Sequence, residues 1–274
     1  MVFFPNAKIN LGLNILFKRS DGFHEIESIF VPVDLCDVLE FIEANEETSF
    51  QSTGIAIPGE PFDNLCVKAW KLLKADYDIP FVSIHLHKHI PIGAGMGGGS
   101  VDGAFMLKAL NEYFELGIHV DKLKYYAAQL GSDCPFFIEN KPAYVTGRGE
   151  LIETIDLILP HSEILIIYPK IHIETKEAYA NITPSVPEES LKEFIEKPFD
   201  SWQGMIKNDF EQSVFGNHKE LETIKNELLD SGAAYCSMTG SGSAIYGIFS
   251  TTSGVNIAEK FENFLVYSVK PISI

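Results

Sequence analysis

Hydrophobic and polar residues along the chain follow a period of two in some stretches and helical spacing in others, so the sequence predicts both strands and helices. Near the start, apolar residues fill every second position from 7 to 15, which predicts a strand pair or one bent strand over residues 3–17. Lys8 and Asn10 then share one face of this strand. The pattern by itself favours a solvent-facing edge for that face.

Further elements follow from the same two periods. Strands are predicted over residues 23–30, 31–35, 37–43, 81–90, 164–168, 233–237, 244–249 and 267–272, a hairpin over 143–153, and helices over 64–75, from 101 onward, and over 120–130, 175–181, 202–215, 218–231 and 255–264. Asp63 or Asn64 is expected to cap the helix that begins near it. The chain changes character at residues 159–161, which predicts an N-terminal domain over 1–158 and a C-terminal domain over 159–274.

A glycine-rich stretch, Pro91–Ala104, precedes one of the predicted helices. Glycine is costly inside a helix or strand, so these residues are expected to serve as bare backbone at the start of the helix. Backbone N–H groups that meet at the positive end of a helix dipole form an anion site, and phosphate is the commonest such anion. The alternative is a tight turn with close helix packing. Gly93, Gly95 and Gly98 match the dinucleotide fingerprint, but the Lys that closes an ATP-binding P-loop is absent.

Composition narrows the class of protein. Apolar residues make up 46% of the 274 residues, as in ordinary globular proteins, and the net charge of −17 opposes non-specific binding to nucleic acid or an anionic membrane. The sequence has neither an export signal nor an apolar run of membrane-spanning length. Its four cysteines are far apart and form no Cys-x-x-Cys pair, so neither a zinc site nor a disulfide framework is expected, and a cytoplasmic location fits.

Three other groups of residues have two interpretations each. Asp133 lies in an apolar setting and is either a residue of a helix-ending turn or a buried acid held for chemistry. Phe23 and His24 follow an Asp-Gly turn and either pack beside it or hold a base by stacking and hydrogen bonding. His85, His87 and His89 alternate along one strand, where a wet sheet face is favoured over a metal site.

Three motifs stand in order along the chain: Pro5-Asn6-Ala7-Lys8-Ile9-Asn10-Leu11, Pro91-Ile92-Gly93-Ala94-Gly95-Met96-Gly97-Gly98-Gly99-Ser100 and Met238-Thr239-Gly240-Ser241-Gly242-Ser243. Together they resemble the GHMP kinase superfamily over nearly the whole chain. The resemblance implies a two-domain α+β fold, with a left-handed βαβ unit in the N-terminal domain and a ferredoxin-like C-terminal domain. Composition and periodicity do not indicate that handedness, because nearly all such crossovers are right-handed.

Asp21-Gly22-Phe23-His24-Glu25 and Gly131-Ser132-Asp133-Cys134-Pro135-Phe136-Phe137 resemble a branch of this superfamily that acts in non-mevalonate isoprenoid synthesis. Members of that branch phosphorylate the C2 hydroxyl of the methylerythritol part of a CDP-linked polyol, with ATP as donor. The resemblance implies that Asp133 is the general base, that Lys8 keeps it ionised and that Asn10 positions the same end of the substrate. Phe23, in place of the more usual Tyr, would stack on cytosine and His24 would read its edge, while Thr175 and Tyr179 match further substrate contacts.

The resemblance also implies an ATP site. Asn64 and Lys88 fall at the adenine pocket, and the phosphates would be held by Pro91, Gly93, Gly95, Met96, Gly97, Gly98, Gly99 and Ser100. Mg²⁺ is expected because phosphoryl transfer needs charge neutralisation, with Ser100 as a candidate ligand. The turn Gly240–Gly242 either closes over the substrate diphosphate or packs beside the phosphate loop.

Other functions remain open on the sequence: a homoserine or mevalonate-type kinase, a nucleotide-binding protein without activity, and an oxidoreductase. The expected partner is a small-molecule substrate rather than nucleic acid or membrane, and the expected state is a monomer or weak homodimer.

Overall fold

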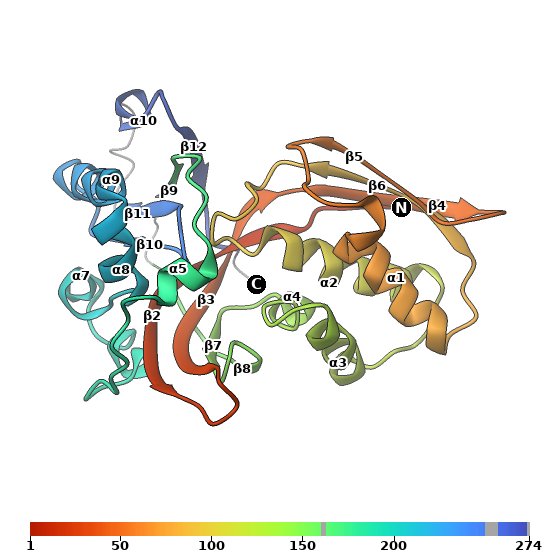
Figure 1. Cartoon of the computed structure of the whole chain (residues 1–274), viewed down its shortest axis with the longest axis horizontal. Helices are drawn as coiled ribbons and strands as arrows, with labels where there is room; N and C mark the ends of the chain where they lie inside the picture. Colours follow the sequence, from red (N-terminus) through yellow and green to blue (C-terminus); the bar gives the residue numbers. More distant parts are fainter. Residues whose placement is uncertain (160–162, 250–256, 273–274) are drawn as a thin grey trace. The chain divides into compact units, whose positions relative to one another are not determined.

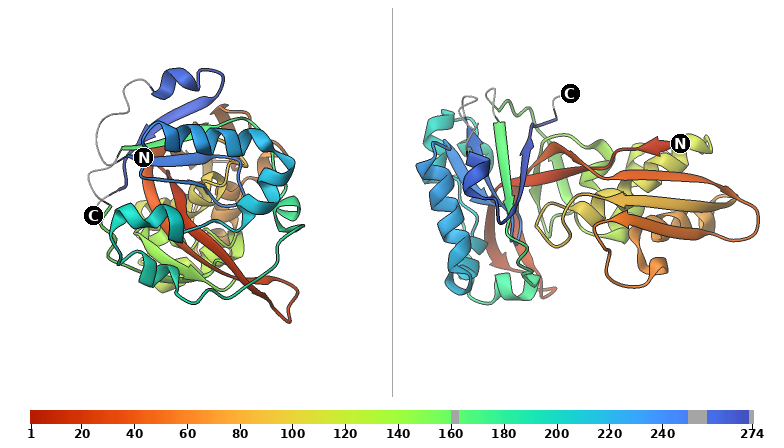
Figure 2. Two further views of the ribbon diagram at one scale, coloured as in Figure 1. Left: turned by 90° about the vertical axis from the view of Figure 1, so that its left-hand side faces the viewer. Right: turned by 90° about the horizontal axis from the view of Figure 1, so that it is seen from above.

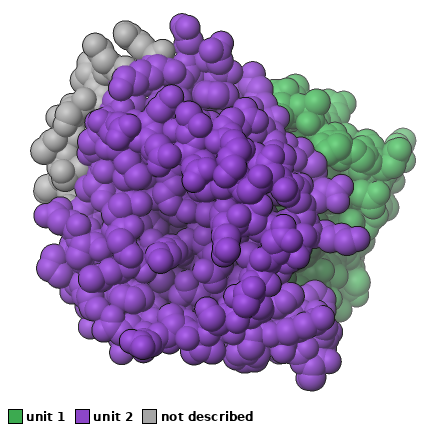
Figure 3. Space-filling view, turned by 60° about the vertical axis from the view of Figure 1, so that its left-hand side comes forward, with its two compact units in different colours: residues 1–7, 35–92, 97–141 green, residues 8–34, 93–96, 142–274 purple. Residues whose placement is uncertain are grey.

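The computed structural model describes residues 1–159, 163–249 and 257–272, which separate into two compact units (Figure 3). Unit 1 comprises residues 1–7, 35–92 and 97–141, and unit 2 comprises residues 8–34, 93–96 and 142–274. Each unit therefore gathers several separate stretches of sequence. The expected division at residues 158 and 159 cuts the chain into consecutive parts, and it stays a prediction. No helix of the described residues is long and apolar enough to cross a membrane.

Unit 1 contains a four-stranded sheet in the order β1-β4-β6-β5. Its elements are β1 (Val2–Phe3), β4 (Val38–Ala44), β5 (Ser49–Gly54), η1 (Pro61–Asp63), α1 (Leu65–Asp76), β6 (Phe81–Lys88), α2 (Gly98–Tyr113), α3 (Val120–Leu130) and α4 (Phe136–Glu139). Strands β5 and β6 pair in parallel and are joined through α1. Along β6, Val82, Ile84 and Leu86 are buried, and the helices α1 and α2 lie along one face of this sheet (Figure 1).

Unit 2 contains two four-stranded sheets, in the orders β2-β3-β7-β8 and β10-β11-β9-β12. The elements of the first are β2 (Asn6–Lys18), β3 (His24–Cys36), β7 (Ala143–Thr146) and β8 (Leu151–Thr154). The remaining elements are β9 (Glu163–Tyr168), α5 (Thr175–Tyr179), α6 (Leu191–Phe194), η2 (Phe199–Ser201), α7 (Trp202–Met205), α8 (Phe210–Asn217), α9 (Lys219–Asp230), β10 (Tyr235–Met238), β11 (Ile245–Phe249), α10 (Ile257–Lys260) and β12 (Leu265–Val269).

The second sheet of unit 2 is antiparallel throughout, and its strands follow the chain order strand, helices, strand, strand, helix, strand. With the order β10-β11-β9-β12, this is the ferredoxin-like arrangement that the sequence resemblance implies. Helix α9 packs on β10 and β11 (Figure 2). Its Leu221, Ile224 and Leu228 enter the core of the unit, as the helical period predicts.

Many of the predicted elements are confirmed. Helix α3 has the predicted bounds, α1 begins one residue after Asn64, and the hairpin β7–β8 turns at Gly147-Arg148-Gly149. The solvent-facing edge favoured for the polar face of β2 is wrong, because Lys8 and Asn10 are both buried. Strand β5 and helix α4 were not predicted from the sequence. Of the helix predicted over 255–264, the structure has α10, and residues 255–256 lie outside the described residues.

The single helix predicted over 202–215 is wrong, because the chain breaks between α7 and α8. Asn208 lies at the break and forms a bridge with Leu13 of β2, whose backbone N–H and C=O bond Lys207 and Asp209. The Asn208 side chain accepts a hydrogen bond from the N–H of Phe210 and donates to the carbonyl oxygens of Met238, the last residue of β10, and Gly240 in the turn that follows. Tertiary hydrogen bonds thus replace the helical ones at this point.

Replacing Leu228 by Ala tests the core of unit 2. Leu228 is fully buried, so the Leu228→Ala variant is expected to lose about 2–5 kcal/mol of unfolding free energy through lost burial and the cavity left behind. Urea unfolding measures this loss. Glu227→Ala, at the exposed neighbouring position, is the control and is expected to stay within about 0.5 kcal/mol of wild type. Equal effects of the two substitutions would contradict the placement of α9.

Candidate active site

The glycine-rich stretch forms a loop that leads into α2. Gly93, Gly95 and Gly97 adopt positive φ angles of 69°, 78° and 71°, a region that residues with a Cβ rarely occupy. Gly97 is the N-cap of α2. The helix is 16 residues long, and no acidic residue lies in its first turn. This loop therefore offers unpaired N–H groups at the positive end of a helix dipole, as an anion site requires.

The first part of the loop packs against the second glycine-rich turn, within unit 2. A Cβ on Gly95 would lie 1.9 Å from the carbonyl oxygen of Thr239, so only glycine fits there. The hydroxyl of Thr239 lies 3.0 Å from the Gly95 carbonyl oxygen, and the N–H of Ala244 donates to the carbonyl of Ala94. A Cβ on Gly240 would lie 3.0 Å from the Gly95 oxygen. The Gly240–Gly242 turn thus packs beside the glycine-rich loop, one of the two alternatives that the sequence left open.

Lys8 and Asn10 are joined to the same part of the loop. The ammonium of Lys8 donates to the side-chain oxygen of Asn10 and, at 3.2 Å, to the carbonyl of Gly95, and its Nζ lies 4.4 Å from the centre of the Phe30 ring. The N–H of Asn10 donates to the Thr239 hydroxyl at 3.1 Å. Both side chains are almost fully buried, with exposed fractions of 2% and 1%. Their sharing of one face, predicted from the period of two, is confirmed.

Lys88 lies within unit 1 between two buried carboxylates. Its ammonium donates to Asp37, to Asp102 at 2.8 Å and to the carbonyl of Gly98 at 2.9 Å. The other oxygen of Asp37 accepts the N–H groups of His89 and Ile90. The three donors of Lys88 are thus matched by three protein acceptors, which fix the start of α2 against β6. A direct contact between Lys88 and a nucleotide stays a prediction.

Burial controls the protonation of this cluster. Burial pulls the pKa of Lys88 down, but the charges of Asp102 and Asp37 outweigh it and raise that pKa above its ordinary value. Burial raises the pKa of Asp102 well above its ordinary value, against the attraction of Lys88. Its Oδ1 atom has no hydrogen-bond partner. One ammonium between two carboxylates leaves a net negative charge, so proton uptake by Asp102 relieves the cost of burial.

A pocket of about 340 Å³ lies within unit 1 beside the first turn of α2. Its walls include the apolar side chains of Phe50, Ile57 and Leu65, together with Asn64 and Gly99. Asn64 caps α1 as predicted, since its side chain accepts the N–H of Cys66. An apolar slot next to a helix N-terminus suits a planar base with phosphates attached.

Asp133 follows α3 in unit 1 and is half-buried. Its neighbour Cys134 is fully buried, and burial raises the pKa of the Cys134 thiol to about 12. That thiol therefore stays protonated at neutral pH and offers no thiolate nucleophile. The preceding Gly131 packs near Cys134 and Ser100, where a Cβ would lie 3.4 Å and 4.0 Å from the two side chains.

The predicted acceptor contacts lie in unit 2. The rings of His24 and Tyr179 stack with their centres 4.8 Å apart and their planes 18° apart. Thr175 is exposed at the first position of α5, on the same short helix as Tyr179. Phe23 is 55% exposed, and the guanidinium of Arg148 lies 4.9 Å from the centre of its ring.

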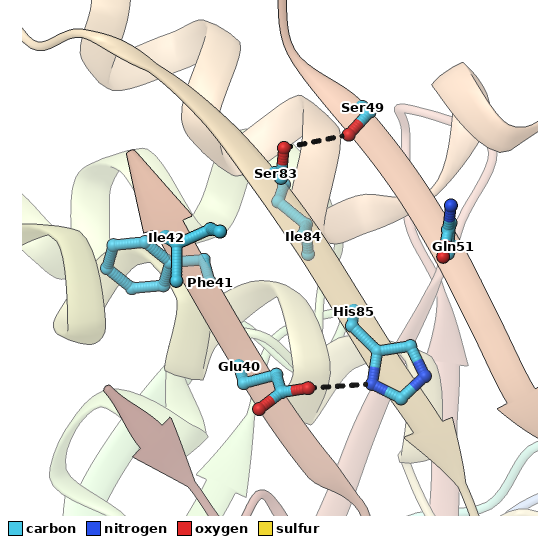
Figure 4. Close-up of a pocket in the computed structure, with 8 residues that line it drawn as sticks. All are labelled: Glu40, Phe41, Ile42, Ser49, Gln51, Ser83, Ile84 and His85. Carbon is cyan, nitrogen blue, oxygen red and sulfur yellow. Dashed lines mark hydrogen bonds and ion pairs between the residues drawn. The ribbon is translucent and has the colours of Figure 1, made fainter. Parts of the chain in front are cut away.

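A second pocket, of about 270 Å³, lies on the sheet face of unit 1 and includes none of the predicted site residues (Figure 4). His85 bonds Glu40 there, and Ser49 bonds Ser83. Among the residues that the structure describes, no group of three or more His, Cys, Asp or Glu side chains could hold a metal ion. His85 and His87 of β6 lie on the wet sheet face that the sequence favoured, whereas His89 follows the end of the strand, which is two residues shorter than predicted.

Sequence reasoning missed several residues that contact the candidates. Asp37 and Asp102 hold Lys88, and Thr239 joins Asn10 to Gly95. Asp102 and Thr239 stand inside glycine-rich motifs, which was a usable signal. Asp37 is the single residue between β3 and β4, and nothing in its sequence context distinguishes it.

Known proteins match this chain over nearly its whole length, and they are GHMP kinases. The family model "GHMP kinases N terminal domain" matches residues 64–141, and "GHMP kinases C terminal" matches residues 183–266. A 4-diphosphocytidyl-2-C-methyl-D-erythritol kinase of Bacteroides thetaiotaomicron is 51% identical over 252 residues, covering 91% of this chain and 92% of the relative. One of Azobacteroides pseudotrichonymphae is 49% identical over 250 residues, covering 91% and 93%. A crystal structure of 4-(cytidine 5'-diphospho)-2C-methyl-D-erythritol kinase superimposes with a TM-score of 0.86 at 28% identity, covering 100% of both chains.

Gly95 gives a direct test of the loop packing. The Gly95→Ala variant is expected to lose at least about 2 kcal/mol of unfolding free energy, because its Cβ meets the Thr239 carbonyl and its φ is positive. Gly99→Ala is the control, since no atom lies within 4 Å of a Cβ there and alanine favours the helix by up to about 1 kcal/mol. Both are measured by urea unfolding. A Gly95→Ala variant as stable as wild type would show that the loop is free of the turn.

Asp102 gives a pH-dependent test. A carboxyl whose pKa is raised by folding contributes stability at low pH that is lost as the pH rises above its ordinary value of 3.8 towards the raised one. The Asp102→Asn variant lacks this loss, so its unfolding free energy should gain on that of wild type as the pH rises from about 4 to 8. Asp78→Asn, at a fully exposed carboxylate, is the control and should show a constant difference. A constant difference for Asp102→Asn as well would contradict the raised pKa.

Proposed function

Because the chain belongs to the 4-diphosphocytidyl-2-C-methyl-D-erythritol kinase family of GHMP kinases, we propose that it transfers the γ-phosphoryl group of ATP to the C2 hydroxyl of 4-diphosphocytidyl-2-C-methyl-D-erythritol. The main support for this proposal is that relatives of that name are about half identical to this chain over nearly its full length. The chain is an ATP-dependent kinase by family. What we propose beyond this is the identity of the acceptor, the C2 hydroxyl as the group that is phosphorylated, and a role in the non-mevalonate isoprenoid pathway.

ATP binds along the glycine loop in this proposal. The adenine occupies the apolar pocket beside Asn64 and Leu65, and the phosphates lie over the loop from Pro91 to Ser100. The N-terminal N–H groups of α2 supply hydrogen-bond donors to the phosphates. Lys88 acts through the backbone of the loop. Its ammonium donates to the Gly98 carbonyl and so fixes the direction in which α2 begins. The main work of such a site is positioning and charge stabilisation.

Mg²⁺ would neutralise charge between the ATP phosphates. Mg²⁺ in such enzymes usually keeps several waters and takes only one or two protein oxygens in addition to the phosphates. The residues present fit this requirement, since the hydroxyl of Ser100 stands in the first turn of α2, directly after the three glycines. We propose that the hydroxyl of Ser100 would bind the Mg²⁺ ion.

Asp133 accepts the proton of the C2 hydroxyl, and Lys8 supplies the positive charge that keeps such a carboxylate ionised. This assignment rests on the positions of both residues in motifs that the family shares. Burial supports the role of Lys8, because an ammonium that is 2% exposed interacts with charges far more strongly than one in water. Asn10 holds Lys8 through its side-chain oxygen and orients the same end of the substrate.

The CDP part of the acceptor binds in unit 2. Phe23 offers an exposed ring on which cytosine stacks, His24 reads the edge of the base, and Tyr179 forms the opposite aromatic wall. The hydroxyl of Thr175 donates a hydrogen bond to the polyol. The His24–Tyr179 stack supports this proposal, because both side chains already lie in contact with each other.

We also propose that the enzyme works in the cytoplasm as a monomer or weak homodimer. All four cysteines are free, which agrees with a reducing compartment. Sedimentation of the purified protein tests the oligomeric state.

Binding of CDP separates this function from its alternatives. CDP at saturating concentration should raise the melting temperature of the protein more than CMP, homoserine or mevalonate does, because only CDP matches the acceptor nucleotide. Stabilisation by homoserine or mevalonate would favour another kinase of the superfamily. ATP binding without turnover of any polyol would favour a nucleotide-binding protein without activity, and stabilisation by NADH would favour an oxidoreductase.

Replacing Asp133 tests the proposed base. The Asp133→Asn variant is expected to lower kcat by about 10²–10⁴-fold while leaving the KM for ATP nearly unchanged, because an amide cannot accept the proton. Steady-state kinetics with ATP and the CDP-linked polyol measure this. Ser132→Ala, at the exposed neighbouring position, is the control and should keep kcat. Full activity of Asp133→Asn would refute the base assignment.

A further inference from the structure

Each polar atom of Asn10 has a hydrogen-bond partner within unit 2. The backbone N–H of Asn10 donates to the Thr239 hydroxyl at 3.1 Å, and its backbone carbonyl accepts the Tyr246 hydroxyl at 2.7 Å. Tyr246 is fully buried, so this second bond is shielded from water. The backbone of Asn10 is thereby fixed. What remains to be set is the direction of its side-chain amide, because a half turn exchanges the oxygen and the nitrogen without changing the shape of the group.

The two ends of this amide face different neighbours. Its oxygen accepts from the Lys8 ammonium and lies 3.2 Å from the Thr239 hydroxyl. Its nitrogen donates to the Ser28 hydroxyl at 2.9 Å. An ammonium carries only donors, so a half turn of the amide would set the donors of Asn10 and Lys8 against each other. The direction of the amide therefore decides whether Lys8 keeps this partner.

Ser28 can take only one role toward the amide. It lies on β3, 18 residues from Asn10 in the chain, and it is fully buried. Its hydroxyl has a single proton, and it donates that proton to the carbonyl of Gly12 at 2.6 Å. The lone pairs of the hydroxyl oxygen are what it presents to Asn10. Ser28 therefore accepts the amide nitrogen and disfavours the amide oxygen at the same place.

We propose that Ser28 is a positioning residue for phosphoryl transfer, which acts on Lys8 through the amide of Asn10. The proposal rests on the proposed function, which gives Lys8 and Asn10 their parts in the reaction. Ser28 holds the amide nitrogen, and the amide oxygen then stays on the Lys8 ammonium. Without Ser28 the amide turns more freely, and the ammonium is held less firmly beside the carboxylate that it keeps ionised.

Replacing Ser28 by Ala tests this role by kinetics. The Ser28→Ala variant is expected to lower kcat about tenfold, as the loss of one buried hydrogen bond allows, and to leave the KM for ATP at its wild-type value. The acid limb of its kcat–pH profile should move to higher pH, because a less ordered ammonium lowers the pKa of the base less. An unchanged kcat or an unmoved acid limb would overturn the proposal.

A double substitution separates positioning from a general loss of structure. In an Asn10→Ala background the amide is gone, so adding Ser28→Ala is expected to leave kcat as it is in Asn10→Ala alone. If Ser28→Ala lowers kcat by the same factor in both backgrounds, Ser28 does not act through Asn10, and the proposal is wrong.

Ser237→Ala is the matched control. Ser237 is a buried serine of the same unit, 1% exposed, and its hydroxyl donates to the Glu211 carboxylate at 3.0 Å. This variant also removes one buried hydroxyl, but it should keep both kcat and the acid limb of wild type. A tenfold loss of kcat in Ser237→Ala would show that any buried hydroxyl of unit 2 has this effect, and would overturn the proposal.

The direction of the amide can also be measured in the wild-type protein, without any substitution. Proton NMR of the labelled protein should show contacts between the side-chain amide protons of Asn10 and the β protons of Ser28. Contacts of those amide protons with the ε protons of Lys8 instead would overturn the proposal. This measurement decides the matter if Ser28→Ala fails to fold. If wild type does not phosphorylate the CDP-linked polyol, the proposed function fails, while the NMR contacts still decide whether Ser28 orients Asn10.

Discussion

The close approach of Gly95 to the carbonyl of Thr239 is the constraint on which the candidate site depends. It joins the glycine-rich loop to a turn 144 residues later in the sequence, and it leaves no room for a side chain on Gly95. Asn10 and Lys8 enter the same network from β2, so three distant segments of unit 2 are held by a few buried hydrogen bonds. Such a network is rigid because each buried polar group needs its partner. Phosphoryl transfer, the reaction of the family, depends chiefly on positioning.

A second polar cluster fixes the other side of the loop. Lys88, Asp37 and Asp102 are each at most 2% exposed, and they connect the end of β6 with the start of α2. A buried ion cluster is a poor source of stability, because desolvation offsets the attraction between the charges. Its value here is geometric, since Lys88 also holds the Gly98 carbonyl and so defines where the N–H groups of α2 point.

Local patterns in the sequence predicted a large part of this arrangement. Helix α3 has the predicted bounds, α9 buries the predicted residues, Asn64 caps α1, and the glycines open α2 with positive φ angles. Each of these features depends on residues within a few positions of one another. Helix α7 shows the limit of such reasoning, because the helix predicted through 202–215 is broken by bonds from Asn208 to distant carbonyls.

The sequence by itself determined the class of elements, the glycine loop and the family, because periodicity, turn chemistry and ordered motifs are local properties. Tertiary structure alone decided that the polar face of β2 is buried, that Lys88 donates to Asp37 and Asp102, and that Thr239 packs against Gly95. The physical reason is that each of these contacts joins residues far apart in the chain, and a strand pattern gives the period of a face without giving what covers it.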